Sequence, residues 1–444
     1  MLHEQVVILG AGVTGLAAGL ASGLPVYEGT RVPGGICASY YVVPGEQERR
    51  HSVPSHGNAY RFEIGGGHWL WGGEPLVLRF IRFLTPLKSY TRKAAVYLPA
   101  QDLFVPYPIQ NHLCHLGSKI ALQVLQEMLE ATPANRSMVT LAEWLRAHFG
   151  QTLCQLFFDP FHEYYTAGLW QSIAPQDGSK SPLNLAQALQ GAFDKVPQAA
   201  GYNVNFLYPI DGLNVLCQRM AQQCDIHYGW RVVRIDVQEK TIFFDHGVRL
   251  PYKAILSTLP LNSMAHMAGL TVHSEPDPFT SVMVVNIGAR KGPRCPQEHW
   301  AYIPQSKAGF HRVGFYSNVD PSFLPVSARN DADRSSIYVE KAYRGGQRPG
   351  EAETASFCQA VVQELQAWGW IEEVEVVDPT WVDTAYTWVW PRSQWQGEMM
   401  CALEAHDIYQ VGRYARWAFR VTDQGISQSI RDGLMAGASF KGCA

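Results

Sequence analysis

Hydrophobic and polar positions along the chain predict several kinds of segment. An uninterrupted apolar run at 6–9 predicts a buried strand, and segments 13–22 and 24–27 are typical of a helix and a second short strand. Residues 44–60 are rich in Pro, Gly, Ser and charge, which indicates an exposed loop. The stretch 76–200 has mainly helical periodicity, with helices expected at 76–84, 116–130, 141–149 and 183–193.

The pattern changes at about residue 205. A helix is expected up to residue 223, and short alternating segments predict strands at 230–237, 241–245, 253–258, 281–287, 313–317 and 337–341. Further along, the pattern predicts a helix at 353–368, an aromatic extended segment at 381–390, a strand from residue 408 to Gly412, and a last helix from about Asp423 to residue 438. Strand–helix units at both ends suggest one domain into which other material is inserted.

The expected fold class is therefore α/β (α+β overall), built from five segments. Residues 1–75 and 401–444 would belong to one nucleotide-binding domain of the Rossmann type, and residues 205–275 form a segment with short alternating strands. Residues 76–204 would contribute a mainly helical part, and residues 276–400 an antiparallel sheet, which together would bind the substrate.

The turn after the first strand has the spacing GxGxxG, with Gly10, Gly12 and Gly15. In such a turn the first glycine permits the tight bend, the second lets a pyrophosphate approach the backbone, and the third lets helix and strand pack closely. Glu28 ends the second strand, eighteen residues after Gly10, near the roughly 20 expected for a carboxylate that bonds a ribose hydroxyl. A carboxylate there disfavours a 2′-phosphate, so NADP is not expected at this site.

Composition narrows the class of protein. The 444 residues include 13 Trp, 20 Tyr and 19 Phe, which suit a large core or a broad apolar or sugar-stacking cavity. A formal charge of −3 gives no electrostatic reason to expect a nucleic-acid partner or an anionic membrane surface. The nine cysteines are scattered without a CxxC motif, which favours a reducing compartment and predicts no disulfide framework and no metal site. No apolar run is long enough to span a membrane, so a cytoplasmic location is expected.

Two further segments are candidates for chemistry. In the segment 62–71, three glycines followed by His68 stand between apolar flanks, where a backbone could lie against a flat ligand. In the segment 159–165, helical spacing would put Asp159, His162 and Glu163 on one side, either as a site wall or as a salt-bridged helix end.

In combination, these motifs resemble one superfamily of flavoproteins. The motifs that carry the resemblance are GxGxxG with Glu28, the segment 31–35 with its Gly34-Gly35 doublet, the glycine loop before His68, and Gly412-Arg413 followed by the segment 422–424. The chain resembles the FAD-dependent amine oxidase and protoporphyrinogen oxidase superfamily over nearly its whole length, and within it the UDP-galactopyranose mutase-like branch. The features that suggest this branch are Gly67-His68, the segment 107–111, and Gly412-Arg413 with the Thr-Asp pair nine residues later.

The resemblance implies a glutathione-reductase-like FAD-binding domain assembled from residues 1–75, 205–275 and 401–444, and roles for particular residues. Gly10, Gly12 and Gly15 would hold the FAD pyrophosphate, Glu28 the adenosine ribose, and the backbone of Val232 the adenine. Arg31 would lie near the phosphates, and Gly66, Gly67 and His68 would line the isoalloxazine, with His68 as the candidate catalytic residue. The helix after Asp423 would direct its N-terminus at the flavin N1–C2=O edge. The remaining implied cofactor-binding residues are Thr14, Gly34, Gly35, Gly412, Arg413, Thr422, Asp423 and Gln424. The candidate substrate residues are Arg312, Arg344, Tyr386, Trp388 and Arg392, beside Trp390 and Trp395, which could equally belong to the core.

The expected activity is that of an FAD-dependent oxidoreductase that acts on a polar small molecule, sugar-like or a nucleotide sugar, by hydride transfer to flavin N5. One alternative is a UDP-galactopyranose mutase-like isomerase that uses reduced FAD without net redox, with NAD(P)H or another reductant as partner. The typical mutase loop has Pro where Gly67 stands, which favours the oxidoreductase. A non-catalytic flavin-binding scaffold is the third hypothesis.

Overall fold

A parallel sheet brings together the two ends of the chain and a central segment. The structure is a computed structural model that describes residues 5–130, 138–175, 184–194, 204–330, 333–418 and 425–441. The parallel strands lie in the order β9, β2, β1, β12, β18, and an antiparallel extension on β12 adds β11 and β10. Their bounds are β1 (Gln5–Leu9), β2 (Val26–Glu28), β9 (Ile226–Tyr228), β10 (Val232–Asp236), β11 (Thr241–Phe244), β12 (Arg249–Ser257) and β18 (Ile408–Gln410).

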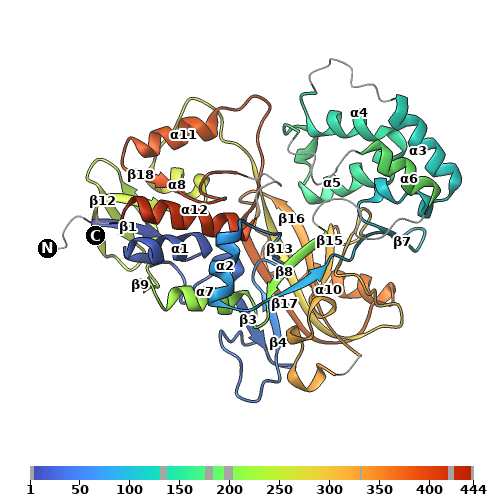
Figure 1. Ribbon diagram of the computed structural model, residues 1–444, viewed down its shortest axis with the longest axis horizontal. Coiled ribbons are helices and arrows are strands. Elements are labelled where there is room, and N and C mark those ends of the chain that lie inside the picture. The colour runs from blue at the N-terminus through green and yellow to red at the C-terminus, as the bar shows by residue number, and fades with distance from the viewer. Residues whose placement is uncertain are drawn as a thin grey trace.

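β1 is apolar from Val6 to Leu9 because both faces of this sheet are covered. Val6 and Ile8 pack into one core, whereas Val7 and Leu9 pack into a second core on the opposite face. On the first face, α1 (Val13–Ser22) lies beside α12 (Ile426–Ser439), with α7 (Leu213–Ala221) and α2 (Pro75–Leu84) further out (Figure 1). The second core takes in α8 (Leu261–Ala268) and α11 (Trp395–Glu404).

A seven-stranded sheet forms the next part of the molecule, in the order β17, β13, β16, β15, β14, β6, β7. Its pairings are antiparallel except for β14 with β6, which are parallel. α10 (Glu351–Ala367) packs on one face through Phe357 and Val361. The bounds are β6 (Ala94–Leu98), β7 (Leu103–Pro106), β13 (Phe279–Lys291), β14 (Trp300–Tyr302), β15 (Arg312–Phe315), β16 (Arg334–Arg344) and β17 (Ile371–Thr387), with the short α9 (Tyr316–Val319) after β15.

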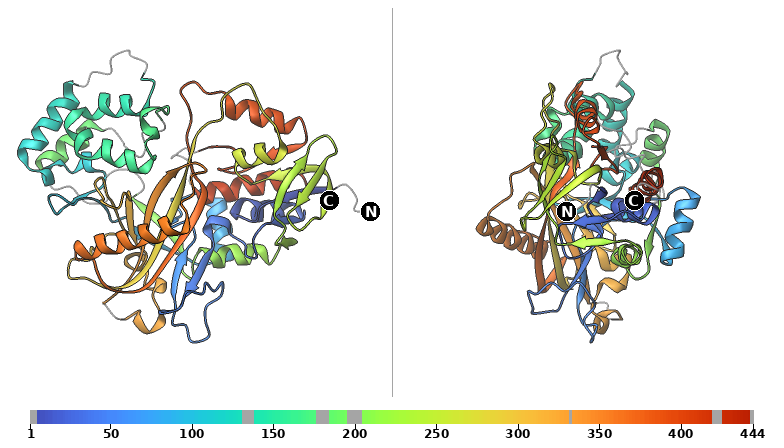
Figure 2. Two further views of the ribbon diagram at one scale, coloured as in Figure 1. Left: turned by 180° about the vertical axis from the view of Figure 1, so that it is seen from behind. Right: turned by 90° about the vertical axis from the view of Figure 1, so that its left-hand side faces the viewer.

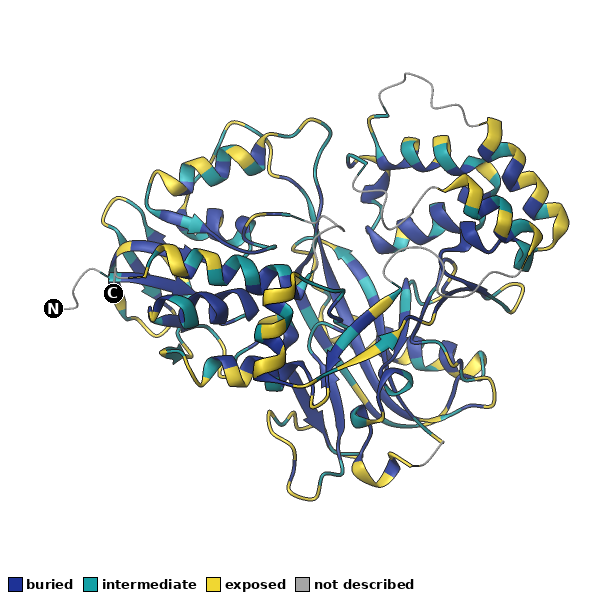
Figure 3. Ribbon diagram, in the orientation of Figure 1, coloured by how far each residue is buried: buried dark blue, intermediate teal, exposed yellow. Residues whose placement is uncertain are grey.

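A helical lobe stands apart at one corner of the molecule (Figures 1 and 2). It contains α3 (Ser118–Glu130), α4 (Leu141–Leu153), α5 (Asp159–Tyr165) and α6 (Leu185–Phe193). Its helices carry buried residues on their inner sides and exposed residues on their outer sides (Figure 3). Two antiparallel two-stranded sheets complete the fold: β3 (Ser39–Val42) with β4 (Tyr60–Glu63), and β5 (Leu87–Thr91) with β8 (Asn205–Pro209).

Most predicted elements are present, with two groups of exceptions. α1 has the bounds expected from the sequence, and α2, α3, α4, α6, α7, α10 and α12 lie where helices were predicted. β5, β6 and β7 lie in the stretch that was expected to be mainly helical and were not predicted as strands; β6 is buried along its whole length and therefore shows no alternation of apolar and polar residues. β13 and β17 also extend well beyond the predicted segments, because long paired strands tolerate the polar residues that end a local pattern.

Candidate functional site

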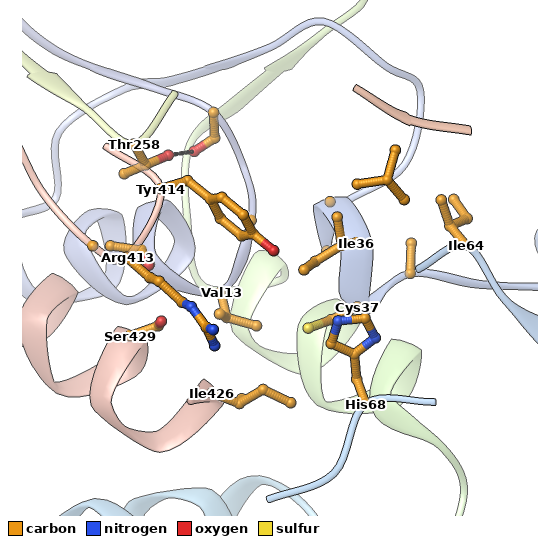
Figure 4. Close-up of a pocket in the computed structure, with 18 of the residues that line it drawn as sticks. Val13, Ile36, Cys37, Ile64, His68, Thr258, Arg413, Tyr414, Ile426 and Ser429 are labelled. Carbon is orange, nitrogen blue, oxygen red and sulfur yellow. Dashed lines mark hydrogen bonds between the residues drawn. The ribbon is translucent and has the colours of Figure 1, made fainter. Parts of the chain in front are cut away.

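A cavity of about 500 Å³ lies where the N-terminal, central and C-terminal segments meet (Figure 4). Its walls come from the turn after β1, the end of β2, the segment that follows β12, part of β17 and the start of α12. The sequence-predicted residues among its lining are Gly10, Gly12, Thr14, Glu28, Gly34, Gly35, Gly67, His68, Gly412 and Arg413. The structure therefore brings most of the predicted cofactor residues to one cavity.

The three glycines of the first turn have different geometries. Gly10 has φ +95°, and a Cβ on it would lie 2.6 Å from Thr258 Oγ1. A Cβ on Gly15 would lie 1.8 Å from the Gly10 carbonyl oxygen, so this glycine lets α1 pack on the turn and does not line the cavity. Gly12 has open space beside it and precedes α1, whose first N–H groups receive no side-chain cap from it. The helix N-terminus is thus open toward the cavity, an arrangement suited to an anion.

Glu28, at the end of β2, is held in place by hydrogen bonds to both oxygens of its carboxylate. Oε2 accepts the Ala11 N–H at 2.7 Å, and Oε1 accepts the Thr30 N–H and hydroxyl, each at 2.8 Å. Oε1 thus already accepts two hydrogen bonds, whereas Oε2 accepts one and can still accept a hydroxyl from a ligand.

The loop after β4 presents Gly67 and His68 to the cavity. Gly66 has φ +79°, and a Cβ on Gly67 would lie 2.4 Å from the Tyr338 hydroxyl, so only glycines fit this close approach to β16. His68 Nδ1 donates to the Gly66 carbonyl at 3.1 Å, which leaves Nε2 as an acceptor. Burial lowers the pKa of His68 below its usual value, so the imidazole is neutral at pH 7.

A buried carboxylate supports this loop from behind. Glu63, at the end of β4, has no exposed surface; it accepts the Tyr208 hydroxyl and, at 3.4 Å, the His68 N–H. Burial raises the pKa of Glu63 to about 7, although the Tyr208 hydrogen bond and the Arg61 charge favour the ionised form. Sequence reasoning did not single out Glu63.

The C-terminal segment reaches the same cavity through Gly412 and Arg413. Gly412 has φ +90°, and a Cβ there would lie 2.7 Å from Thr14 Oγ1, so this glycine lets the strand end pass close to α1. The Arg413 side chain extends into the cavity from the side opposite His68 (Figure 4). Thr422, Asp423 and Gln424 lie outside the described residues.

Two smaller cavities, of about 80 and 60 Å³, adjoin this site. The first lies between His68 and Arg413, and both include Arg312 and Tyr386. Aromatic and imidazole side chains line the second, namely Tyr107, Phe157, Phe161, His162, Tyr165, Tyr302 and His311. Its walls come from both the helical lobe and the seven-stranded sheet, so the pocket depends on how these two parts pack together.

Arg312 is paired with the buried Glu340, which accepts a hydrogen bond from its guanidinium. Burial opposes ionisation of Glu340, but the Arg312 charge and the adjacent His311 outweigh it and lower the pKa to about 2. The cavity therefore carries a fixed carboxylate beside its guanidinium. Sequence reasoning missed Glu340 and His311. The one available signal was an acid on the face of β16 that also carries Tyr338 and Ala342, whereas Ile337 and Val339 pack on the α10 side.

Other predicted residues lie elsewhere. Arg344 is exposed and donates to the Ala167 carbonyl at 3.2 Å, and Arg392 is exposed on a turn. Trp388 is buried against Tyr165 and donates to Thr280 Oγ1, so it belongs to the core, as does Trp395. Trp390 is half-buried and donates to the Pro276 carbonyl. Arg31 and Val232 are near the Glu28 end of the fold but are not among the cavity-lining residues.

The α5 candidates separate in the structure. Asp159 pairs with Arg146 at 2.9 Å, which is the salt-bridged helix end that was one of the two alternatives. Glu163 accepts the Trp170 indole N–H at 2.9 Å, and only His162 reaches the small cavity. Of the two alternatives, Asp159 therefore follows the salt-bridged helix end, and His162 alone contributes to the wall of a cavity.

No protein-family model matches the chain. A reduced UDP-galactopyranose mutase is similar in structure, with 18% identity, a TM-score of 0.82, and coverage of 98% of this chain and 95% of the other. A protein from Exiguobacterium sp. 255-15, provisionally assigned as a protoporphyrinogen oxidase, has 15% identity, a TM-score of 0.68 and 99% coverage of both chains. A putrescine oxidase variant with redesigned cofactor binding has 16% identity, a TM-score of 0.57 and 99% coverage of both.

The chain therefore has the same fold as these three solved structures. The resemblance inferred from the sequence is thereby confirmed at the level of fold, and so is the expected α/β class. None of the helices in the described part of the chain combines the length and apolar character needed to cross a bilayer.

Proposed function

We propose that the protein is an FAD-dependent oxidoreductase that acts on a polar, sugar-like small molecule. The observation that supports this most is the cavity of about 500 Å³, to which three distant segments contribute, with a second polar cavity beside it. That volume falls within the roughly 300–1,000 Å³ of ligand and cofactor sites.

The residues present fit FAD. The open backbone at Gly12 and the uncapped start of α1 would receive the pyrophosphate, and Glu28 at the other end of the turn would receive a ribose hydroxyl. Arg413 would contact the pyrophosphate or the ribityl chain. Gly67 and His68 would lie against the isoalloxazine, where a larger residue than glycine would collide with Tyr338.

The two smaller cavities are where we place the substrate. When bound, FAD supplies a hydride acceptor at N5. His68 can take a proton from a substrate hydroxyl or amine through Nε2, because its Nδ1 hydrogen is engaged by Gly66 and the ring is neutral. Tyr386 and Arg312 can orient polar groups of the substrate, and the surrounding aromatic residues exclude water.

The Arg312–Glu340 pair is the reason for preferring a neutral polar substrate. Because Glu340 is ionised and buried against it, the Arg312 guanidinium presents less net positive charge to a ligand than an unpaired arginine would. An isolated phosphate group would also face the Glu340 charge.

A second candidate is a mutase that works with reduced FAD and without net redox. The TM-score of 0.82 with a reduced UDP-galactopyranose mutase favours it. Arg413 and Arg312 line one cavity and could both contact a diphosphate. This enzyme would need NAD(P)H or another reductant to enter its active form.

An anaerobic single-turnover experiment separates the two candidates. The purified protein is first tested for bound FAD, or for uptake of added FAD, by its absorption spectrum before and after acid precipitation. It is then mixed with a panel of amino sugars, hydroxy sugars and nucleotide sugars, in both oxidised and pre-reduced forms. We expect stoichiometric bleaching of the oxidised flavin by one class of substrate.

Three outcomes contradict parts of the proposal. A colourless protein that does not take up FAD would refute both enzyme hypotheses. Turnover only by the pre-reduced form, without consumption of reductant, would favour the mutase. FAD binding without turnover of any panel member in either form would favour a flavin-binding scaffold. An Arg294→Ala variant, altered at an exposed ion pair with Asp102 far from the cavities, serves as the matched control.

A further inference from the structure

Helix α2 carries apolar side chains on both its faces. Its inner face, with Val77, Ile81 and Leu84, is buried in the core. Its outer face carries Leu76 and Phe83, whose exposed fractions are 77% and 85%. Residues seven positions apart lie on the same face of a helix, so Leu76 and Phe83 share one exposed face, and an exposed apolar patch marks an interaction site.

The outer face of α2 stands out from the molecule. In the right-hand view of Figure 2, α2 projects beyond the other elements on its side. Within the described part of the chain, only four large apolar side chains are more than 60% exposed, and three of them, Leu76, Phe83 and Met435, lie on α2 and on its neighbour α12. Figure 3 shows exposed residues along the outside of both helices.

The charges on this helix are of one sign. Arg79 and Arg82 are exposed, and α2 contains no acidic residue. Among the ion pairs of the described residues, neither arginine takes part. Glu74, which precedes the helix, forms an ion pair with Arg431 at 2.8 Å. The face is therefore apolar and cationic.

We propose that α2 binds the surface of an anionic lipid bilayer as an interfacial helix. Phenylalanine and leucine flanked by arginine are typical of helices that lie in the headgroup region, and arginine is attracted to anionic lipids. The outer face of one projecting ten-residue helix is small beside the ~800 Å² per partner of a stable protein interface. A flat lipid surface accepts such a projection without a complementary groove.

The test is co-sedimentation of the full-length protein with vesicles of phosphatidylcholine alone or mixed with phosphatidylglycerol. We expect binding to the mixed vesicles that weakens with added salt. A Leu76→Gln, Phe83→Gln double variant should lose at least about tenfold in apparent affinity, and an Arg79→Gln, Arg82→Gln double variant should bind weakly and with little salt dependence. Phe193→Gln is the matched control, because Phe193 is 79% exposed on α6 in a different lobe.

The proposal is overturned if the parent protein remains in the supernatant with the mixed vesicles, or if the Leu76, Phe83 variant binds as the parent does. It is also overturned if light scattering shows a concentration-dependent dimer that this variant abolishes, because the occupant of α2 would then be a second copy of the chain. Thermal unfolding of each variant checks that these exposed substitutions leave the fold intact. Co-sedimentation and light scattering require neither bound flavin nor turnover, so their outcome is independent of the proposed enzymatic function.

Discussion

At the scale of single residues, buried carboxylates determine much of the character of the site. Glu340 neutralises part of the Arg312 charge in the smaller cavity, and Glu63 supports the loop that carries His68. The two differ because Glu340 lies against a guanidinium, which lowers its pKa to about 2, whereas burial dominates at Glu63 and raises its pKa to about 7.

The raised pKa of Glu63 predicts a pH dependence of stability. Between its unfolded value of 4.5 and its folded value of about 7, the unfolded chain loses the proton first, so rising pH destabilises the fold. Relative to Glu63→Gln, the parent should lose about 3 kcal/mol of unfolding free energy across this window, at ~1.36 kcal/mol per pKa unit. Denaturant titrations of both proteins at a series of pH values measure the difference, with exposed Glu351→Gln as control. Parallel curves would show that Glu63 does not titrate in this range.

Arg413 provides a direct test of the cofactor site. Arg413→Ala should weaken FAD binding, because it removes a charge-assisted hydrogen bond worth about 1.5–3 kcal/mol, or roughly ten- to a hundredfold in Kd. Flavin fluorescence titration measures the affinity. Arg294→Ala should bind as the parent does, since Arg294 pairs with Asp102 at the surface. If the parent, Arg413→Ala and Arg294→Ala proteins bind FAD with equal affinity, Arg413 does not contribute to the proposed cofactor site.

At the scale of elements, close packing of α12 on α1 places the C-terminal segment. A Cβ on Gly433 would lie 2.2 Å from the Thr14 carbonyl oxygen, and one on Gly437 would lie 2.3 Å from the Ala18 carbonyl oxygen. Glycines at these positions let the two helix backbones approach, and the start of α12 then reaches the wall of the cofactor cavity.

Gly433→Ala should therefore destabilise the protein. Overpacking of this kind costs about 1–3 kcal/mol, and displacement of α12 should weaken FAD binding as well. Gly397→Ala on α11 is the matched control: a Cβ there meets nothing within 4 Å, so it should be neutral or stabilise by about 0.4–1 kcal/mol. Thermal unfolding of the two variants and the parent measures these changes in stability. Similar melting temperatures would mean that the two helices can separate without cost.

At the scale of the whole molecule, the site depends on contacts among three parts. The part built on the parallel sheet contributes Gly12 and Arg413, the seven-stranded sheet contributes Arg312 and Tyr386, and the helical lobe adds aromatic side chains. The helical lobe is tied to the sheet by hydrogen bonds such as that from the Tyr164 hydroxyl to the Ser306 carbonyl, at 3.1 Å. The five-segment domain organisation expected from the sequence remains a proposal.

Local spacing was enough to predict the first strand–turn–helix unit, because the glycines at 10, 12 and 15 and the apolar run at 6–9 each act on near neighbours. Glu28 and Gly412-Arg413 could also be predicted as candidate site residues from the sequence, because each is part of a short motif. The roles of these residues in binding remain predictions. Helices such as α1 and α10 could be predicted from the periodicity of apolar residues, because this periodicity depends only on which face of a single element is buried.

Tertiary structure alone decided which distant segments meet. β6 at residue 94 pairs with β14 at residue 300, and Glu340 reaches Arg312 across adjacent strands, neither of which a local pattern encodes. It also separated Asp159 and Glu163 from His162 and left Phe83 exposed, although all four belong to helical segments with apolar residues. The physical reason is that hydrophobic periodicity specifies which face of an element is buried, whereas the identity of the partner that buries it depends on how the whole chain packs.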